Sequence, residues 1–460
     1  MLTALYSVCN LFHLGAWNSR YWDEWVFYRD IPRLREVETS CAIGRCKLPF
    51  TFLWEQPLLQ LGPWALRLLV IMALFLASVL VWKIICGIPQ LGQWERSVTT
   101  IFFLLLPING ARIGLSSARA SFALALFTLG VWLVCQRRFT QTLFGLALIS
   151  YTMFWPSFQV FALVTVVPLA LKDLALQQKI SKFTIIVGSL IPCLALANTF
   201  ILANLVVRFG FFAQDDGYNV IRPAFMARAV LIGGLLSAPL AWRLFQSLAI
   251  KKSIRHFSGG PLEFGLFILA LGTFPYLAVG HFANLSDWII MWLPDNSDWD
   301  SRHQLLQGMG FALLVTSLLK TIQPHMIDRF LLVMISACLV FNLSIYANYY
   351  VDGLKQRDVM ASFRSQSVQL TGIQLFRIDD SAQDVNARGR GLRDYEWEGM
   401  ISEALDRPIT IWENNPQTLG CTTEILGKSV QIRKTSGRLK TLVTRGKIVT
   451  LDFTDLVACR

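Results

Sequence analysis

The chain has 460 residues, of which 54% are hydrophobic and only 16% charged, and its net charge is +12. Soluble proteins average about 25% charged residues, so a compact soluble domain is excluded and lipid must cover much of the surface. The basic residues cluster in short turns between apolar runs. This pattern favours the cytoplasmic bias of Lys and Arg in membrane proteins over a nucleic-acid partner.

Apolar runs follow one another through the first 351 residues. About 20 apolar residues are enough for a helix to cross the hydrocarbon core of a bilayer. The first run has neither the basic start nor the cleavage site of a signal peptide. We therefore predict a mainly α, polytopic transmembrane helix bundle over 1–351, with about eleven spans at 1–17, 64–86, 98–115, 117–136, 142–155, 157–171, 183–207, 226–250, 262–282, 303–321 and 328–351.

The segment around Trp155-Pro156 decides the topology. The apolar stretch 142–171 is too long for one helix and too short for two full ones, and proline interrupts helical hydrogen bonding. We expect two short helices broken at Pro156. This double crossing places the N-terminus in the cytoplasm and the C-terminus outside.

Basic turns support this topology. Placing them all in the cytoplasm follows the positive-inside rule and leaves three longer loops outside, at 18–63, 208–225 and 283–302. We therefore predict that the protein is integral to a membrane, and the bacterial inner membrane fits this pattern best. The turns in question contain Arg137-Arg138, Lys172 to Lys182, Lys251 to Arg255, and Lys320 with Arg329.

The composition changes at about residue 352. Apolar runs shorten to strand length, and Tyr395–Leu405 has a helical pattern. We predict a small soluble extracytoplasmic α/β domain over 352–460. Its expected strands lie in Ser367–Ile378, Ile409–Trp412, Ser429–Arg433 and Lys447–Phe453.

Two adjacent carboxylates follow the first apolar run, in Asn18-Ser-Arg-Tyr-Trp-Asp-Glu-Trp25. One interpretation is an interfacial tryptophan belt with solvated charges beside it. The other is that Asp23 or Glu24 is catalytic, as a general base, or holds a divalent cation at the mouth of a cavity.

Asp23-Glu24 resembles the diacidic motif that the GT-C superfamily of membrane glycosyltransferases carries in its first extracytoplasmic loop. An amphipathic stretch, Trp54–Leu61, and a helix opening at Pro63 extend the resemblance. It implies a polyprenyl-phosphate-sugar donor and a glycan, lipid or protein acceptor. It also implies a role in cell-envelope polysaccharide synthesis and a possible Mg or Mn ion as cofactor.

Arg112 and Arg119 lie seven residues apart near the outer ends of two spans, on one helical face if the helix is continuous. A membrane-embedded arginine usually faces a cavity or an anion, and a lipid phosphate would satisfy it. Snorkelling to the interface is the alternative.

Asp298-Trp-Asp-Ser-Arg-His303 precedes the tenth span. Arg302 and His303 are candidates for binding the donor phosphate at a helix N-terminus, with Asp300 as a secondary acidic residue. An N-cap at Asp300 beside an interfacial arginine is the alternative. Asp215-Asp216 forms a second acidic pair and a further candidate for the site. The glycine that follows, Gly217, makes a simple turn the alternative interpretation.

Four cysteines, Cys41, Cys46, Cys421 and Cys459, lie outside the apolar runs. They are candidates for two disulfides if their side of the membrane is oxidising. Phosphate-binding loops, zinc-protease motifs and serine-hydrolase elbows are all missing from the sequence.

Two other functions stay open. A transporter or flippase of a lipid-linked saccharide would also need buried arginines and broken helices, but not Asp23-Glu24. A non-catalytic membrane scaffold with a partner-binding tail would need none of the outer acidic residues.

Overall fold

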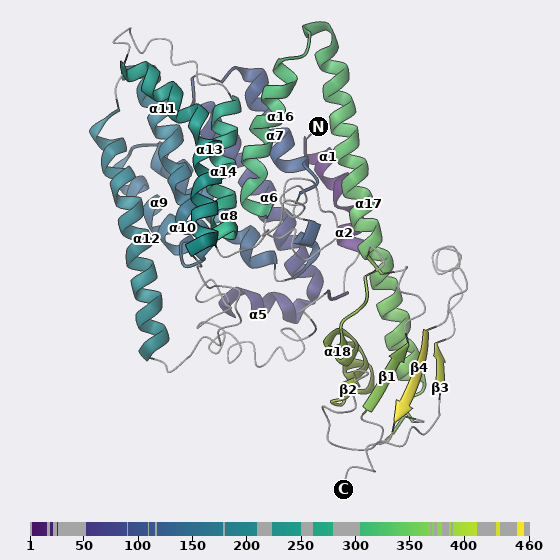
Figure 1. The fold of residues 1–460 in the computed structure, drawn as a ribbon. Helices are drawn as coiled ribbons and strands as arrows, with labels where there is room; N and C mark the ends of the chain where they lie inside the picture. The colour runs from purple at the N-terminus through teal and green to yellow at the C-terminus, as the bar shows by residue number, and fades with distance from the viewer. Residues whose placement is uncertain are drawn as a thin grey trace.

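The computed structural model describes residues 2–15, 19–21, 25, 52–89, 91–108, 110–115, 117–177, 180–208, 223–249, 261–278, 304–368, 370–371, 375–379, 386–387, 390–411, 429–432 and 449–454. Within them the chain is mainly helical, as predicted (Figure 1). The bundle begins with α1 (Leu2–Cys9), α2 (Leu11–Gly15), α5 (Phe52–Leu61), α6 (Pro63–Cys86), α7 (Gln93–Leu105), the 3-10 helix η2 (Gly110–Ile113) and α8 (Ser117–Cys135). It continues with α9 (Phe139–Thr152), α10 (Pro156–Phe161), η3 (Ala162–Thr165), α11 (Val166–Gln177), α12 (Lys182–Arg208), α13 (Pro223–Ala249), α14 (Pro261–Ala278), α16 (Gly308–Lys320) and α17 (Pro324–Ser365).

Four described helices are long and apolar enough to cross a membrane. Helix α6 is apolar on all sides, which is typical of a helix that contacts both protein and lipid. It begins at Pro63, where the missing N–H costs nothing because the first turn has no helical acceptor. The protein is therefore an integral membrane protein, while the count of eleven spans stays a prediction. The four are Pro63–Cys86, Ser117–Cys135, Ala224–Trp242 and His325–Ser365.

The third expected span, 98–115, is not one helix. Helix α7 ends at Leu105, η2 follows at Gly110–Ile113, and α8 begins at Ser117. Pro107 explains the break, because proline lacks an N–H and restricts the residue before it. The condition that would place Arg112 and Arg119 on one helical face is therefore not met.

Charged contacts gather at one end of the bundle, here called the basic end. Arg137, just after α8, pairs with Asp173 of α11 at 2.5 Å. Because these partners meet, the segment of α9, α10, η3 and α11 begins and ends at this end of the bundle. That this segment crosses the membrane twice stays a prediction. Lys320 at the end of α16 likewise pairs with Glu95 at the start of α7, at 2.6 Å.

The opposite end, here called the loop end, contains the start of α6, η2 and the described part of the first loop. Arg67 of α6 donates hydrogen bonds to the carbonyls of Ile113 (3.2 Å) and Ser19 (2.5 Å). Helix α17 leaves the bundle at this end and leads to the C-terminal sheet, on the side where α5 lies (Figure 1). The described part of the first loop and the C-terminal segment therefore share one end of the molecule.

Helix α17 continues without a break from Pro324 to Ser365, through the expected domain boundary at 351/352. The expected strand beginning at Ser367 is wrong in its first half, because a turn follows α17 and β1 begins only at Leu375. The other elements agree closely with the sequence. They are β1 (Leu375–Asp379), α18 (Asp394–Leu405), β2 (Thr410–Ile411), β3 (Ser429–Ile432) and β4 (Val449–Thr454).

The strands form one sheet in the order β2-β1-β4-β3. Strands β1 and β2 are parallel, and α18 provides the crossover that a parallel pair requires. Strand β4 is antiparallel to both β1 and β3, with Leu375 opposite Thr454. A helix–sheet unit thus lies at the end of the long α17, next to the loop end of the bundle.

Candidate functional site

Arg112 is buried in η2 at the loop end and is only 4% exposed. Its Nε donates to the hydroxyl of Tyr346, and its Nη2 donates to Oδ1 of Asn342 at 2.9 Å. The guanidinium also lies over the Tyr346 ring, 5.1 Å from the centroid. These partners are all neutral, and Arg112 has no ion pair within the described part of the chain. A buried cation without a counter-ion is costly, so this site favours an anion.

The partners of Arg112 are themselves held in place by α2, α7, α17 and the turn between α1 and α2. Asn342 donates from Nδ2 to the carbonyls of Leu105 and Cys338, each at 2.8 Å, which turns its Oδ1 toward Arg112. His13 stacks on the Tyr346 ring, with centroids 4.9 Å apart. Its Nδ1 lies 3.2 Å from Oδ1 of Asn10. Arg112 therefore has a fixed orientation, set by residues of three helices and of the turn at Asn10.

A small cavity of about 30 Å³ opens beside Arg112. It adjoins a larger cavity of about 80 Å³, because Phe103, Leu124 and Leu305 line both. Apart from Thr128, whose hydroxyl is bonded within its own helix, the lining of the larger cavity is apolar. A cation beside an apolar space suits a ligand with an anionic head and a hydrocarbon chain.

Arg119 has a different environment. Its Nε and Nη2 donate to the two carboxylate oxygens of Glu55, at 2.6 and 2.5 Å. Glu55 is completely buried and belongs to α5, which contains the amphipathic stretch predicted at the end of the first loop, Trp54–Leu61. The pair fixes α5 against α8, so Arg119 already has an anionic partner inside the protein, whereas Arg112 has none.

Arg67 and Glu55 are two buried charged residues that were not predicted as site residues from the sequence. Arg67 is fully buried, holds the carbonyls of Ser19 and Ile113, and lies over the Tyr21 ring at 5.6 Å. It thereby joins α6, η2 and the first loop. Arg67 could have been singled out from the sequence because it is a charged residue at the fifth position of an apolar helix. Glu55 could have been singled out in the same way, as an acidic residue in an apolar stretch.

Many of the predicted site residues lie outside the described residues, and their roles stay predictions. In the part of the chain that the structure describes, no group of three or more His, Cys, Asp or Glu side chains could hold a metal ion. The residues outside are Asp23, Glu24, Asp215, Asp216, Asp300, Arg302, His303, Cys41, Cys46, Cys421 and Cys459.

Comparison with known proteins adds one structural similarity. No protein-family model matches the chain, and no curated protein matches it by sequence. The crystal structure of ArnT from Cupriavidus metallidurans bound to undecaprenyl phosphate overlaps 91% of this chain and 86% of its own, with 14% identity and a TM-score of 0.36. A TM-score this low decides neither fold nor chemistry.

Proposed function

We propose that this chain is a membrane glycosyltransferase that moves a sugar from a polyprenyl-phosphate-linked donor to an acceptor on the extracytoplasmic face. The supporting observation is Arg112, a buried cation with only neutral partners, at a small cavity that adjoins an apolar one. A lipid phosphate supplies both an anion for the guanidinium and a chain for the apolar space.

The roles of the residues follow from the charges that change during transfer. The sugar leaves its phosphate, so negative charge grows on that phosphate, and a fixed guanidinium stabilises it. Asp23 or Glu24 would accept the proton of the acceptor hydroxyl as that oxygen attacks the sugar. Arg302 and His303 are further candidates for contacts with the donor phosphate.

The location belongs to the same proposal. We place the protein in the bacterial inner membrane, with the N-terminus in the cytoplasm and the C-terminal domain in the periplasm. The basic end, with Arg137 and Lys320, would then face the cytoplasm, in agreement with the positive-inside rule. The loop end, with Arg112 and the first loop, would face the periplasm.

The test is the pair of substitutions Arg112→Gln and Arg112→Lys in purified protein in lipid nanodiscs. We expect Arg112→Gln to weaken binding of polyprenyl phosphate about 100-fold, equivalent to about 2.7 kcal/mol, and Arg112→Lys to recover part of it, because lysine keeps the charge but loses the two-point geometry. Arg96→Gln is the control, because the side chain of Arg96 bonds the Ile88 carbonyl at the basic end.

Sugar transfer is measured on the same samples with a labelled lipid-linked donor. Unchanged binding in both Arg112 variants would contradict the phosphate site. Movement of the lipid across the bilayer with no transfer by the wild-type protein would contradict the enzyme and favour a flippase.

A further inference from the structure

A short piece of the first loop is held between α17 and α18. The backbone N–H of Arg20 donates to Oε1 of Gln356 at 3.2 Å, and Nε2 of Gln356 donates to the carbonyl of Arg20 at 2.8 Å. The side chain of Arg20 forms an ion pair with Glu403 of α18. One residue of the loop is thus bonded through both its backbone and its side chain.

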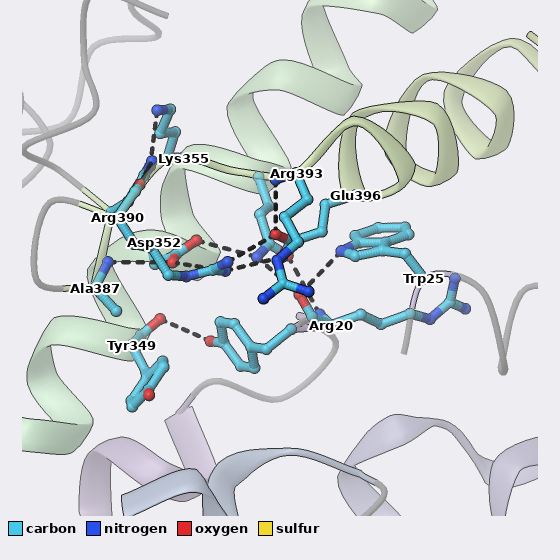
Figure 2. A network of polar contacts seen from close by, with 12 residues as sticks. Arg20, Trp25, Tyr349, Asp352, Lys355, Ala387, Arg390, Arg393 and Glu396 are labelled. Carbon is cyan, nitrogen blue, oxygen red and sulfur yellow. Dashed lines mark hydrogen bonds and ion pairs between the residues drawn. The ribbon is translucent and has the colours of Figure 1, made fainter. Parts of the chain in front are cut away.

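Two aromatic residues hold the loop on either side of the acidic pair in the sequence. The hydroxyl of Tyr21 donates to the carbonyl of Tyr349 at 2.7 Å. Trp25 is 2% exposed and packs in a core with Phe363 and Trp397. Its Nε1 donates to the carbonyl of Arg20 at 3.0 Å, as Figure 2 shows. Both anchors therefore depend on α17, and Trp25 also depends on α18.

Two glycines allow this close approach. A Cβ at Gly353 of α17 would lie 2.9 Å from the Cβ of Ser19, and a Cβ at Gly399 of α18 would lie 2.7 Å from the Cβ of Trp25. Neither position admits a methyl group unless the loop moves. Ser19 and Trp25 of the loop therefore pack against the two helices with no room for an added methyl group at either glycine.

A buried charge network makes α17 and α18 one rigid frame. Arg390 donates two hydrogen bonds to the carboxylate of Glu396, at 2.7 and 2.9 Å, and contacts Asp352 of α17 at 3.5 Å (Figure 2). Both carboxylates are fully buried. Burial by itself would lower the pKa of Arg390, but Asp352 and Glu396 raise it above its usual range, so the guanidinium stays charged between the two carboxylates.

We propose that the C-terminal helix pair positions the first loop, with Gly353 and Gln356 of α17 and Gly399 and Glu403 of α18 as positioning residues for Asp23-Glu24. This inference rests on the proposed function, because the anchored residues Arg20, Tyr21 and Trp25 flank the acidic pair in the sequence and the proposed function assigns that pair to transfer. A general base must lie within hydrogen-bond reach of its proton, and a displacement of about 1 Å can reduce the rate about 100-fold. The helix pair is thereby part of the catalytic end of the protein.

The experiment compares Gly353→Ala and Gly399→Ala with Gly234→Ala. Gly234 lies in α13, and a Cβ there would meet no atom of another described segment within 4 Å. Alanine is the better helix former at all three positions, so intrinsic helix stability should rise in each. We measure hydrogen–deuterium exchange of the peptide 19–25, turnover in sugar transfer, and binding of polyprenyl phosphate.

For Gly353→Ala and Gly399→Ala we expect faster exchange in 19–25 and a turnover reduced by about 100-fold, with lipid binding unchanged. Ser19→Gly should restore turnover to Gly353→Ala, because it removes the opposing Cβ and hydroxyl. Exchange and turnover equal to those of Gly234→Ala would overturn the inference, as would faster exchange with full turnover. An inactive wild-type protein would instead overturn the proposed function.

Discussion

Arg137 and Asp173 form an ion pair of 2.5 Å between residues 36 positions apart in the sequence. The pair joins the end of α8 to α11, so the chain returns to the end of α8 after α9, α10 and η3. Asp173 also accepts hydrogen bonds from the hydroxyls of Ser181 and Thr184, each at 2.6 Å, at the start of α12. One carboxylate thus connects three helices at the basic end.

Asp173→Asn should destabilise this end by about 2 kcal/mol, since it weakens a charged hydrogen-bonding centre. Burial by itself would raise the pKa of Asp173, but the hydrogen bonds from Ser181 and Thr184 and the contact with Arg137 lower it to about 2. The unfolded value is about 3.9. The carboxylate therefore contributes stability above about pH 4, and this contribution is lost as the pH falls toward 2.

The measurement is thermal unfolding in detergent between pH 2 and pH 7. The wild-type protein should lose stability over that acidic interval, and Asp173→Asn should lose less. Parallel curves for the two proteins would contradict the assignment.

Glu55→Gln should destabilise the protein by about 3 kcal/mol, because it leaves the Arg119 guanidinium without its buried carboxylate. The double variant Glu55→Leu with Arg119→Met should recover most of that loss, since apolar residues of similar volume need no counter-charge. Thermal melting of the three variants tests this. A double variant no more stable than Glu55→Gln would refute it.

Tyr346→Phe should weaken polyprenyl-phosphate binding about tenfold, or about 1.4 kcal/mol. The substitution keeps the ring under Arg112 but removes the hydroxyl that accepts the Nε–H. Tyr350→Phe is the matched control on the same helix, since the ring of Tyr350, which the substitution keeps, contacts the ring of Phe12. Equal affinities for the two variants would show that the hydroxyl does not orient Arg112 for binding.

Gly145→Ala should reduce the stability of the α8–α9 pair, although alanine is the better helix former. A Cβ at Gly145 would lie 2.6 Å from the carbonyl oxygen of Gly130, and a Cβ at Gly130 would lie 2.8 Å from that of Gly145. The backbones of the two helices are in direct contact here, so a change of side-chain rotamer cannot relieve the clash with the added methyl group. The melting temperature should fall below that of Gly234→Ala, and a rise would contradict the packing.

Asp23→Asn and Glu24→Gln should each reduce sugar transfer, and the double variant should abolish it, while polyprenyl-phosphate binding persists. A carboxamide has the shape of the carboxylate but accepts no proton from a hydroxyl. Asp328→Asn, an exposed position near the start of α17, is the control. Full transfer by both single variants and the double variant would remove the acidic pair from the mechanism.

The sequence predicted the features that depend on local patterns. The runs at 64–86 and 117–136 became α6 and α8, and the strand predicted at Ser429–Arg433 became β3. The prediction for 98–115 was wrong because hydropathy averages over Pro107, which ends helical hydrogen bonding without making the segment polar. The boundary at 352 marks a change in composition within α17, where a helix becomes polar without ending.

Composition and periodicity determined by themselves that this chain is a membrane-embedded helical protein, because burial of apolar surface depends on what each short segment contains. Only the tertiary structure distinguished the two arginines. Glu55 neutralises Arg119 from 64 residues away, and Arg112 meets neutral groups more than 200 residues away. Whether a buried charge has a charged partner is decided by packing between distant segments, and among the described residues that packing gives Arg112 only neutral partners.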